Sequence, residues 1–482
     1  MTLSLLGNIL DPLTNLLDPF GLLDGLFGKD EEAKDDHAPV QPPYYDSVPV
    51  FDGRSAELNN LLLNSTAVGH LDGIVGGIQP NVNIRTVSGI GNNLNNPEFG
   101  AADQPFVRLT EAEYGEDGAP RGVWDGEQTL PNERDISNVI VNQDENGDGV
   151  EEATHSVHGT NLLLMSFGQF FDHGLDFIER SSNPDDKYYI PLREGDPLYS
   201  FSDDGNPRND ITSIRVTRGA EAINPATGDP YELRSHTNKT SPFTDQNQTY
   251  GSSDAVTFYL RETARDDNGD LMRDSDGNLV KTASLAHSEK DASGYWNLPT
   301  YRDILLNNGV SEAEINAAVA ANSFDMLMEA DGFVDFRNVT NPYTGAPDGN
   351  PLLLDISFDA DPEGPAFNLG KLLSHYVAGD GRANENTGLT PIHTIFHRDH
   401  EYWVEQIREN GGADWSEDKL FETAKSIIES EYQRIIFDEF VDAMAGSLPG
   451  PIPHGFDGYH PRVDAQISEE FAHAVYRVGH SM

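Results

Sequence analysis

Three short segments of the chain carry side chains that could do acid–base or metal chemistry. In the first, Gln169, Asp172 and His173 stand at the end of an apolar run that is long enough for a buried helix. Burial of unpaired polar groups costs free energy, so polar residues in such a helix indicate partners or a function. The alternative is a histidine whose hydrogen bonds are satisfied in the core, and this segment alone does not decide between the two.

The other two segments lie nearer the C-terminus. Arg382 and Glu385 stand three residues apart just before a predicted helix, where the alternative to a catalytic pair is a surface ion pair of little energetic value. His480 follows Gly479 at the end of another predicted helix. A histidine there could ligate a metal while the glycine lets a flat cofactor approach, or it could simply complement the helix dipole.

Helices are expected to position these side chains. Apolar periodicity predicts them over 161–173, 391–409, 417–445 and 467–480. The second is expected to begin with Thr390 as its N-cap and Pro391 in its first turn, and the third to follow Ser416 as a cap. Residues 255–261 have a strand-like composition. The sequence therefore predicts a mainly α fold with long loops and a few short strands.

The composition excludes several classes of function. The 482 residues include 81 acidic and 31 basic side chains, giving a formal net charge of −50, and no cysteine. Such a charge repels nucleic-acid phosphate, so the chain is not expected to bind DNA or RNA. The absence of cysteine excludes disulfides, thiolate catalysis, iron–sulfur clusters and cysteine-ligated zinc.

One large domain is expected over residues 50–482. Residues 1–28 form a leucine-rich segment that aspartates interrupt, and residues 29–48 have the composition of a charged, proline-rich linker. The first segment lacks the basic start of a signal peptide and the ~20 apolar residues of a membrane helix. We expect neither a conventional signal peptide nor a transmembrane segment.

Taken together and in this order, the three segments resemble the animal-type haem peroxidases, the myeloperoxidase- and peroxinectin-like branch of the peroxidase–cyclooxygenase superfamily. Further matches extend the resemblance over roughly residues 80–480, among them Ile84-Arg85-Thr86, Asn92-Asn93, Leu130-Pro131, His393-Thr394, Arg398-Asp399-His400, Val463-Asp464 and Tyr476-Arg477. The resemblance implies the family's mainly α haem peroxidase fold, with haem between central helices, in a bacterial-type member. It also implies an insertion around 252–365 and a chain that is incomplete after His480, the missing C-terminal part of a longer polypeptide being expected to follow.

The resemblance assigns roles to residues that match the family's motifs. These roles are the proton-transferring distal base (His173), the charge-stabilising arginine (Arg382), the orienting amide (Gln169), the haem iron ligand (His480) and two carboxylates that form ester bonds to haem b (Asp172 and Glu385). Asn386 stands where the most specialised family members have a methionine, so efficient chloride oxidation is not expected.

Calcium is the second cofactor that the resemblance suggests. Four residues before Tyr250 can offer oxygen and match the family's calcium loop: Ser241, Phe243, Asp245 and Asn247. The family's aspartate directly after the distal histidine is Gly174 here, so calcium is expected to be held by a substitute, bound weakly, or absent. Two further acidic loops, Asp144–Gly149 and Asp266–Asn278, have partial calcium-loop spacings that turn chemistry also explains.

Three histidines share one face of the helix predicted over 391–409: His393, His397 and His400. A zinc protease helix would have a glutamate directly after the first of them, where this chain has Thr394. We interpret all three as structural hydrogen-bonding residues, with a separate metal site as the alternative.

The resemblance implies a haem peroxidase that uses hydrogen peroxide to oxidise halide, thiocyanate or small phenolic donors through a ferryl intermediate. One alternative is a fatty-acid dioxygenase of the same superfamily, although the radical tyrosine of such enzymes stands three residues before the proximal histidine and Tyr476 stands four before His480. The other is a non-catalytic, calcium-binding extracellular module with an incomplete haem site. The family's extracellular habit and the acidity favour secretion without a conventional signal peptide.

Overall fold

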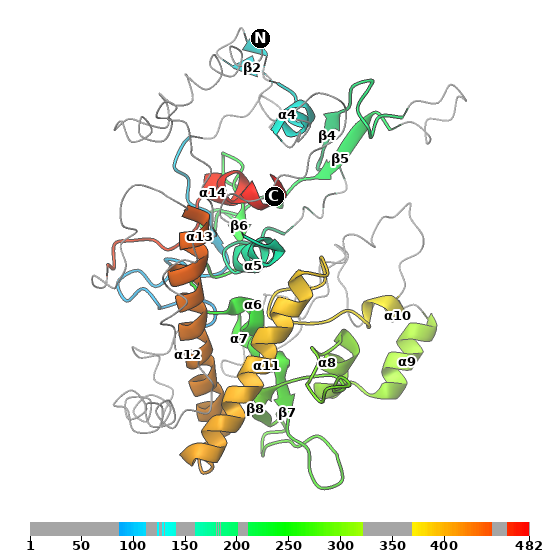
Figure 1. The fold of residues 1–482 in the computed structure, drawn as a ribbon, viewed down its shortest axis with the longest axis vertical. Coiled ribbons are helices and arrows are strands. Elements are labelled where there is room, and N and C mark those ends of the chain that lie inside the picture. The colour runs from blue at the N-terminus through cyan, green and yellow to red at the C-terminus, as the bar shows by residue number, and fades with distance from the viewer. Residues whose placement is uncertain are drawn as a thin grey trace, which may run out of the picture. The chain divides into compact units, whose positions relative to one another are not determined.

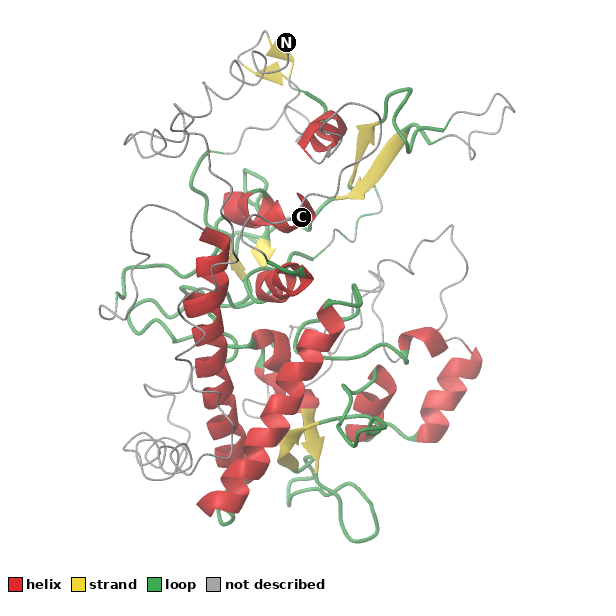
Figure 2. Cartoon of the chain, viewed as in Figure 1, coloured by secondary structure: helices red, strands yellow, loops and turns green. Residues whose placement is uncertain are grey.

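Helices make up most of the regular structure in the described residues (Figures 1 and 2). The computed structural model describes residues 86–111, 123–124, 128–129, 131–140, 160–179, 181, 183, 185–200, 211–321, 369–445 and 460–481. The predicted N-terminal segment, the linker and the acidic loop Asp144–Gly149 lie outside these ranges. Of the helices within them, none is long and apolar enough to cross a membrane. The shorter helices are α4 Glu133–Ile140, α6 Asn247–Tyr250, α7 Asp254–Leu260, α8 Tyr301–Asn307, α9 Glu312–Ala321 and α10 Leu369–Leu372.

Helix α5, Leu162–His173, carries the first of the chemical segments and confirms the prediction of a helix there. The Asn161 side chain caps it by accepting a hydrogen bond from the Leu163 amide (2.9 Å), an amide that the first turn of a helix leaves free. Phe170 is fully buried, and its ring stacks on Phe396 with the centroids 5.2 Å apart. The apolar side of α5 therefore packs against α11, and the end of α5 is held inside the protein.

Helix α11, Leu389–Ile407, is one of the two longest helices of the described residues. The predicted N-cap is wrong, because Gly388 occupies the cap position and Thr390 lies inside the first turn. The Thr390 hydroxyl donates instead to the Ala383 carbonyl (2.7 Å). The helix runs directly into a π-helical turn, η2 Arg408–Gly412.

Helix α12, Glu417–Ile435, packs beside α11 (Figure 1). Ser416 caps it as predicted, since its hydroxyl accepts a hydrogen bond from the Lys419 amide (3.2 Å). A π-helical turn, η3 Ile436–Phe440, joins α12 to α13, Val441–Ala445. The buried apolar and aromatic side chains of α11 and α12 form much of the core: Ile392, Phe396, Trp403, Val404, Ile407, Leu420, Phe421, Ala424, Ile428 and Tyr432.

The C-terminal segment forms two short helices rather than the single helix predicted from the sequence. They are α14, Glu469–His473, and the 3₁₀ helix η4, Val475–Ser481. The break falls at Ala474, whose backbone (φ −125°) leaves the helical region. The Arg477 guanidinium donates to the Ala472 carbonyl (2.8 Å), an acceptor that a continuous α-helix would have bonded to a backbone amide.

The described strands pair in antiparallel twos. The pairs are β1 Gln104–Pro105 with β6 Thr237–Asn238, β2 Val123–Trp124 with β3 Gln128–Thr129, β4 Lys187–Pro191 with β5 Ser213–Thr217, and β7 Arg261–Thr263 with β8 Lys281–Leu285. Just beyond β1, Val107 forms a parallel bridge with Ser468, which ties the β1–β6 pair to the start of α14. The few short strands and the dominance of helices confirm the predicted fold class.

The strand predicted over 255–261 is wrong, because most of that segment is helix α7. The Ser253 hydroxyl accepts a hydrogen bond from the Val256 amide (3.2 Å) and caps the helix. The Thr257 hydroxyl donates back to the Ser253 carbonyl (3.1 Å). Local capping therefore overrides the strand preference of a β-branched and aromatic composition.

Turns occupy the acidic loop Asp266–Asn278. The Asp266 carboxylate accepts hydrogen bonds from the amides of Asn268 (2.9 Å) and Asp270 (3.0 Å), and Asp274 does the same in the turn that follows. These backbone hydrogen bonds lower the pKa of Asp266 below its ordinary value. The contacts support turn chemistry as the explanation of this loop.

Candidate active site

His173, the last residue of α5, lies between two carboxylates. Its ring is buried, with Nδ1 3.4 Å from Asp380 Oδ1 and Nε2 3.5 Å from Glu385 Oε2. Both acids come from the loop before α11. The Glu385 side chain is 26% exposed, so solvent reaches the Nε2 side of the imidazole while the Nδ1 side stays enclosed.

Gln169 stands one helical turn before His173 and contacts the same loop. Its amide nitrogen donates to Glu385 Oε2 (2.8 Å), and its amide oxygen accepts a hydrogen bond from the Asn386 side chain. Gln169 and Glu385 are 216 residues apart in sequence. The structure thus brings together the first two chemical segments that the sequence singled out.

The Arg382 guanidinium clamps the end of α5. It donates to the carbonyls of His173 (3.0 Å) and Asp176 (2.9 Å) and forms an ion pair with Asp380 (2.7 Å). It also lies over the Phe177 ring, 4.8 Å from the centroid. Arg382 is therefore joined to His173 both through the backbone and through Asp380.

The charges of this cluster set its protonation. Burial would raise the pKa of Asp380, but the charges of Arg382 and His173 outweigh it and bring that pKa to about 2. Burial would lower the pKa of Arg382, and the Asp380 charge raises it above its ordinary value instead. Burial would also raise the pKa of Glu385, which the contact with His173 and the Arg382 charge hold below its ordinary value. Both carboxylates that flank the imidazole are therefore ionised at neutral pH.

A second acidic pair lies on the other side of the α5 terminus. Arg477 of η4 forms ion pairs with Asp172 Oδ2 (3.0 Å) and Asp176 Oδ1 (3.3 Å). Asp172 Oδ1 is buried without a hydrogen-bond partner among the described residues. Burial, and then the Asp172 charge, raise the pKa of Asp176 to about 7.

Sequence reasoning missed several residues of this site. Asp380 carried a signal, because it stands two residues before Arg382 in Gly-Asp-Gly-Arg. Arg477 belongs to the Tyr-Arg-x-Gly-His end, which the sequence analysis quoted without giving the arginine a role. Asp176 had no local signal, because only the fold brings its carboxylate within reach of Arg477.

The predicted iron ligand lies in η4, and its own geometry is not described. His480 falls within the 3₁₀ helix Val475–Ser481, but its side chain lies outside the described part of the chain. The same helix packs on α5, where the Tyr476 hydroxyl donates to the Gly168 carbonyl (3.0 Å). The third chemical segment therefore lies against the first, while the role of His480 stays a prediction.

The predicted calcium loop is filled by side-chain amides. The side-chain amide nitrogen of Asn247 donates hydrogen bonds to the carbonyls of Gly174 (3.0 Å) and Ser241 (2.6 Å). A Cβ at Gly174 would lie 2.2 Å from the amide nitrogen of Gln248, so that glutamine occupies the space where the family has its aspartate. An amide nitrogen is a donor, whereas calcium needs oxygen ligands. The Asn247 and Gln248 amides therefore occupy part of the predicted loop from Ser241 to Asn247, which also contains Phe243 and the buried Asp245 carboxylate, and calcium binding there stays a prediction.

The three histidines of α11 have different surroundings. His400 is hydrogen-bonded on both ring nitrogens, to the Tyr250 hydroxyl (3.0 Å) and the Ala283 carbonyl (2.9 Å). His393 has no hydrogen-bond partner on either nitrogen within the described ranges, nor has His397 on Nε2. Burial lowers their pKa values, to about 3 for His393 and His397 and to about 4 for His400. All three rings are therefore neutral at physiological pH.

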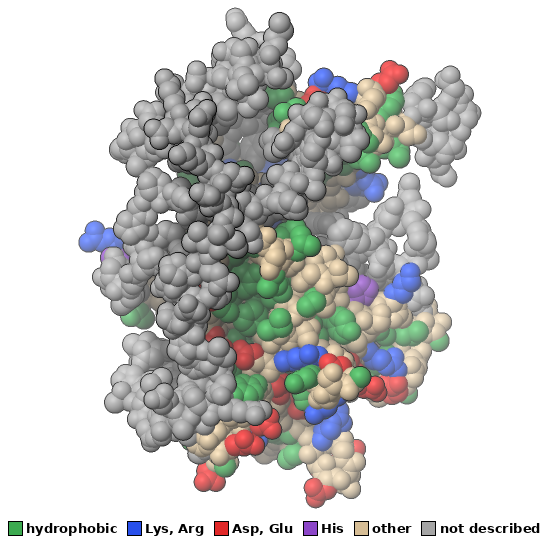
Figure 3. All heavy atoms as spheres, viewed as in Figure 1, with side chains coloured by type: hydrophobic (Ala, Val, Ile, Leu, Met, Phe, Trp, Pro, Cys, Tyr) green, Lys and Arg blue, Asp and Glu red, His purple; other side chains and the backbone are tan. Residues whose placement is uncertain are grey.

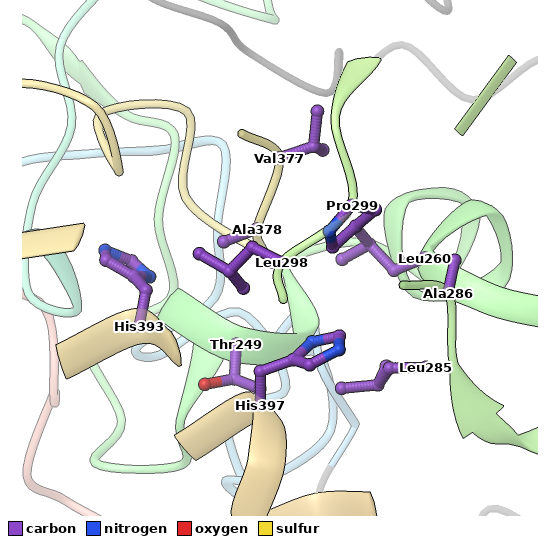
Figure 4. Close-up of a pocket in the computed structure, with 10 residues that line it drawn as sticks. All are labelled: Thr249, Leu260, Leu285, Ala286, Leu298, Pro299, Val377, Ala378, His393 and His397. Carbon is purple, nitrogen blue, oxygen red and sulfur yellow. The ribbon is translucent and has the colours of Figure 1, made fainter. Parts of the chain in front are cut away.

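His393 and His397 line a small cavity between α11 and the β8 region (Figure 4). Most of its other walls are apolar: Leu260, Leu285, Ala286, Leu298, Pro299, Val377 and Ala378. Its volume of about 10 Å³ leaves room for roughly one water molecule. The cavity is too small for a substrate, so the His173 cluster is the candidate active site.

The His173 cluster can carry out acid–base chemistry. A buried imidazole whose two ring nitrogens face ionised carboxylates can take up a proton and give it back. The fixed positive charge of Arg382 lies beside it, and such charges stabilise negative charge that develops during a reaction. The Gln169 amide adds a donor and an acceptor on the accessible side.

A comparison with known protein families matches both segments of the chain that build the His173 cluster. The family model described as animal haem peroxidase matches residues 84–303 and 354–482. The unmatched residues 304–353 fall inside the segment 252–365 that the sequence suggested as an insertion. Both matched stretches contribute to the cluster, the first with α5 and the second with Asp380 to Glu385.

The chain is similar to peroxidases over most of its length. It is 24% identical to Peroxidase mlt-7 of Caenorhabditis elegans, covering 83% of this chain and 42% of that protein. It is also 24% identical to Peroxinectin A of Dictyostelium discoideum, covering 82% of this chain and 57% of that one. Among solved structures, Peroxidase A of Dictyostelium discoideum superposes with a TM-score of 0.53 at 20% identity, covering 83% of this chain and 60% of the other. The chain spans about half the length of these two curated relatives and about a quarter of the length of several others.

Proposed function

Because the chain belongs to the animal haem peroxidase family, we propose that it uses hydrogen peroxide to oxidise halide, thiocyanate or small phenolic donors. One observation carries the proposal: His173, Gln169, Arg382 and Glu385 converge from two segments more than 200 residues apart, which hydrogen bonds and a short charge contact join. A family member that had lost the activity would have no need to keep this set of four together.

The residues present fit a haem group. Asp172 Oδ1 is a buried carboxylate oxygen without a hydrogen-bond partner in the described part of the chain, as an oxygen that reacts with the haem would be. At Gly479, beside the predicted ligand, an added Cβ would meet no described atom within 4 Å, so a flat group can approach. We propose that His480 binds the iron and that Asp172 and Glu385 attach the haem through ester bonds. When bound, haem supplies the redox chemistry.

His173 would move the proton. Its Nε2 lies on the accessible side of the ring, where it can take a proton from hydrogen peroxide and return it to the departing oxygen. Asp380 Oδ1 lies 3.4 Å from Nδ1 without a hydrogen bond between them, and its charge would favour this orientation of the ring. Because Asp380 is locked to Arg382 by an ion pair, the imidazole has little freedom to turn.

Arg382 and Gln169 would act on charge and orientation. The buried guanidinium supplies a permanent positive charge beside His173, which favours negative charge developing on an oxygen nearby. The Gln169 amide holds Glu385 through a hydrogen bond of 2.8 Å and thereby fixes the second carboxylate of the cluster.

The fatty-acid dioxygenase alternative is not favoured. Such an enzyme needs a tyrosine placed to form a radical at the haem edge. Tyr476 donates its hydroxyl to the Gly168 carbonyl (3.0 Å), so that hydroxyl is already engaged in packing η4 on α5.

Reconstitution with haem tests the proposal. The expected result is a Soret band and peroxidase turnover, with His173→Ala keeping the band but losing turnover by about 10²- to 10⁴-fold, the typical contribution of a general acid–base. His375→Ala is the matched control, because His375 lies outside the cluster and its ring nitrogen contacts the Lys371 carbonyl. Undiminished turnover in His173→Ala would overturn the role of His173. The absence of any haem band would favour the non-catalytic alternative.

The ester bonds need their own test. Haem should stay with the protein after acidic organic extraction once the enzyme has turned over with hydrogen peroxide. It should be extracted from the Asp172→Asn/Glu385→Gln double variant. Complete extraction of haem from the unaltered protein would contradict the ester proposal while leaving the peroxidase proposal intact.

We propose further that the protein works outside the cell. The net charge of −50 supports this, since a large acidic excess suits a salt-rich or calcium-rich medium outside the cell. Detection of the protein in the medium of its source culture, with a cytosolic marker absent from that medium, is the measurement that checks it.

A further inference from the structure

Two histidines and a glutamate meet at the start of the C-terminal segment, away from the His173 cluster. His236 stands just before β6, while Glu469 and His473 are the first and last residues of α14. One ligand atom from each residue lies within 4.8 Å of those of the other two. Glu469 is buried, the His236 side chain is 12% exposed and the His473 side chain is 44% exposed.

The distances match a tetrahedral metal site. Glu469 Oε2 lies 3.2 Å from His236 Nδ1 and 3.3 Å from His473 Nδ1. Nitrogen and oxygen ligands about 2.0–2.1 Å from a tetrahedral zinc ion are separated from one another by about 3.3 Å. Each imidazole nitrogen therefore already stands at the separation from Glu469 Oε2 that a common ion would impose. To bind the ion, His473 Nδ1 would exchange its contact with the Glu469 backbone carbonyl (2.8 Å) for the metal.

The carboxylate is oriented for this task. Its other oxygen, Glu469 Oε1, accepts hydrogen bonds from the His236 amide (3.1 Å) and the Ser235 hydroxyl (3.4 Å). Arg108 lies 3.4 Å from that same oxygen. Glu469 Oε1 is thus held by neighbouring donors, as the outer contacts of metal-binding carboxylates usually are. Oε2 is the oxygen within reach of both rings, although His236 Nδ1 also lies 3.3 Å from Oε1.

We propose that His236, Glu469 and His473 bind a divalent transition metal of the zinc class. Two nitrogens and one carboxylate oxygen suit zinc and its neighbours, whereas calcium and magnesium require sets made of oxygen. The exposed edge of His473 leaves a fourth position for water. The bound ion would tie the segment before β6 to α14, which leads directly into the helix that contains His480. This site is separate from the proposed haem chemistry and does not depend on it.

The local charges favour binding of a cation. Three ligands with one carboxylate carry a charge of −1, and the chain as a whole carries −50. Arg108 opposes the ion, but its guanidinium also donates to the Arg234 carbonyl (2.5 Å), which holds it on the Oε1 side of the carboxylate. An ion on the Oε2 side is therefore separated from the arginine by the carboxylate itself.

Zinc titration of the 482-residue chain tests the proposal. The chain is first treated with a chelator, then titrated with ZnCl₂ by calorimetry at pH 7.5 in excess MgCl₂, which masks general carboxylate binding. We expect one tight site per chain, a rise in Tm on adding zinc, and a cobalt complex with the visible absorption of four- or five-coordinate Co²⁺. His473→Gln and Glu469→Gln should each weaken zinc binding at least tenfold.

The control is His375→Gln, because His375 makes the same contact of a ring nitrogen with the carbonyl four residues earlier (2.9 Å) that His473 makes (2.8 Å). It should bind zinc as the unaltered chain does. His473 is partly exposed, so its variant should fold even if Glu469→Gln does not, which circular dichroism checks. Absence of a tight site, or equal zinc affinity in His473→Gln and the unaltered chain, overturns the proposal. Either result leaves the haem peroxidase proposal untouched, because that is read from the Soret band and turnover.

Discussion

At the scale of single residues, the site is governed by how its buried charges are paired. Asp380 and Arg382 neutralise each other in the interior, and the same aspartate faces Nδ1 of His173. One carboxylate thus does two things: it balances the buried guanidinium and orients the imidazole. Its loss should affect stability and turnover together.

Replacing Asp380 tests this double role. Asp380→Asn leaves the buried Arg382 without its counter-ion, so we expect unfolding free energy to fall by about 3 kcal/mol, as when one partner of a buried pair is removed. Urea unfolding measures the loss, and turnover of the haem-loaded protein should fall as well. Asp291→Asn is the control, because the pair of Asp291 with Arg398 is about one-third exposed and should cost less than about 1 kcal/mol. Equal losses in the two variants would show that the Asp380 pair is no stronger than a surface pair.

Asp176 makes a prediction about pH. Its folded pKa of about 7 lies above the ordinary 3.8, so the folded state binds the proton more tightly. The stabilisation from this proton is complete below about pH 3.8 and is lost as pH rises through about 7. Asp176→Asn does not titrate, so its stability relative to the unaltered protein should improve by about 2 kcal/mol between pH 5 and pH 8. Chemical unfolding at both pH values measures the difference, and an unchanged difference would contradict the raised pKa.

At the scale of elements, the sequence predicted best where local chemistry decides the structure. The Ser416 cap and the extent of α5 follow from neighbouring residues, and both predictions were correct. The cap at Thr390 was wrong because its hydroxyl bonds to Ala383, a loop residue that the fold brings close. The strand over 255–261 was wrong because a cap outweighs composition there.

The candidate site divides in the same way. Gln169, Asp172 and His173 could be found because polar residues at the end of an apolar helix are unusual. Asp176 could not be found, since its role arises only when η4 packs against α5 and supplies an arginine. Sequence reasoning thus identified side chains with chemistry of their own and missed one whose chemistry depends on packing.

Helix α11 makes a prediction about acid stability. Burial, and then the nearby charges of His400 and His287, lower the pKa of His397 from 6.5 to about 3. Its neutral ring contributes stability that is complete above about pH 6.5 and is lost as pH falls toward 3. His397→Leu removes this loss. Between pH 7.5 and pH 5 the unfolding free energy of the unaltered protein should therefore fall by about 2 kcal/mol more than that of the variant. His375→Leu, at a more exposed position, should behave as the unaltered protein does. Parallel profiles of unfolding free energy against pH for His397→Leu and the unaltered protein would show that the pKa of His397 does not change on unfolding.

At the scale of the whole molecule, helices distant in sequence build one site on a highly charged chain. α11 packs on both α5 and α12, so the helix that follows the Arg382 loop also supports the helix that carries His173. Most of the net charge of −50 lies outside the site, because the buried charges of the site are largely paired. Figure 3 shows acidic and basic side chains interspersed over the described part of the face in view.

The surface charge predicts how stability depends on salt. Like charges in excess repel one another most in the compact folded state, and salt screens that repulsion over a Debye length of about 10 Å at 0.1 M. Raising NaCl from 20 mM to 500 mM should therefore increase Tm by about 5 °C, read by differential scanning calorimetry. An uncharged osmolyte at equal osmolality should produce a smaller rise, which separates screening from exclusion of the solute.

CaCl₂ at matched ionic strength should add nothing beyond the rise in Tm that NaCl produces, because donor amides fill the predicted calcium loop. A Tm that falls with NaCl would mean that attractive pairs, rather than net repulsion, dominate the surface. A large extra rise with CaCl₂ would mean that Asn247 turns its amide over and that the loop binds calcium after all.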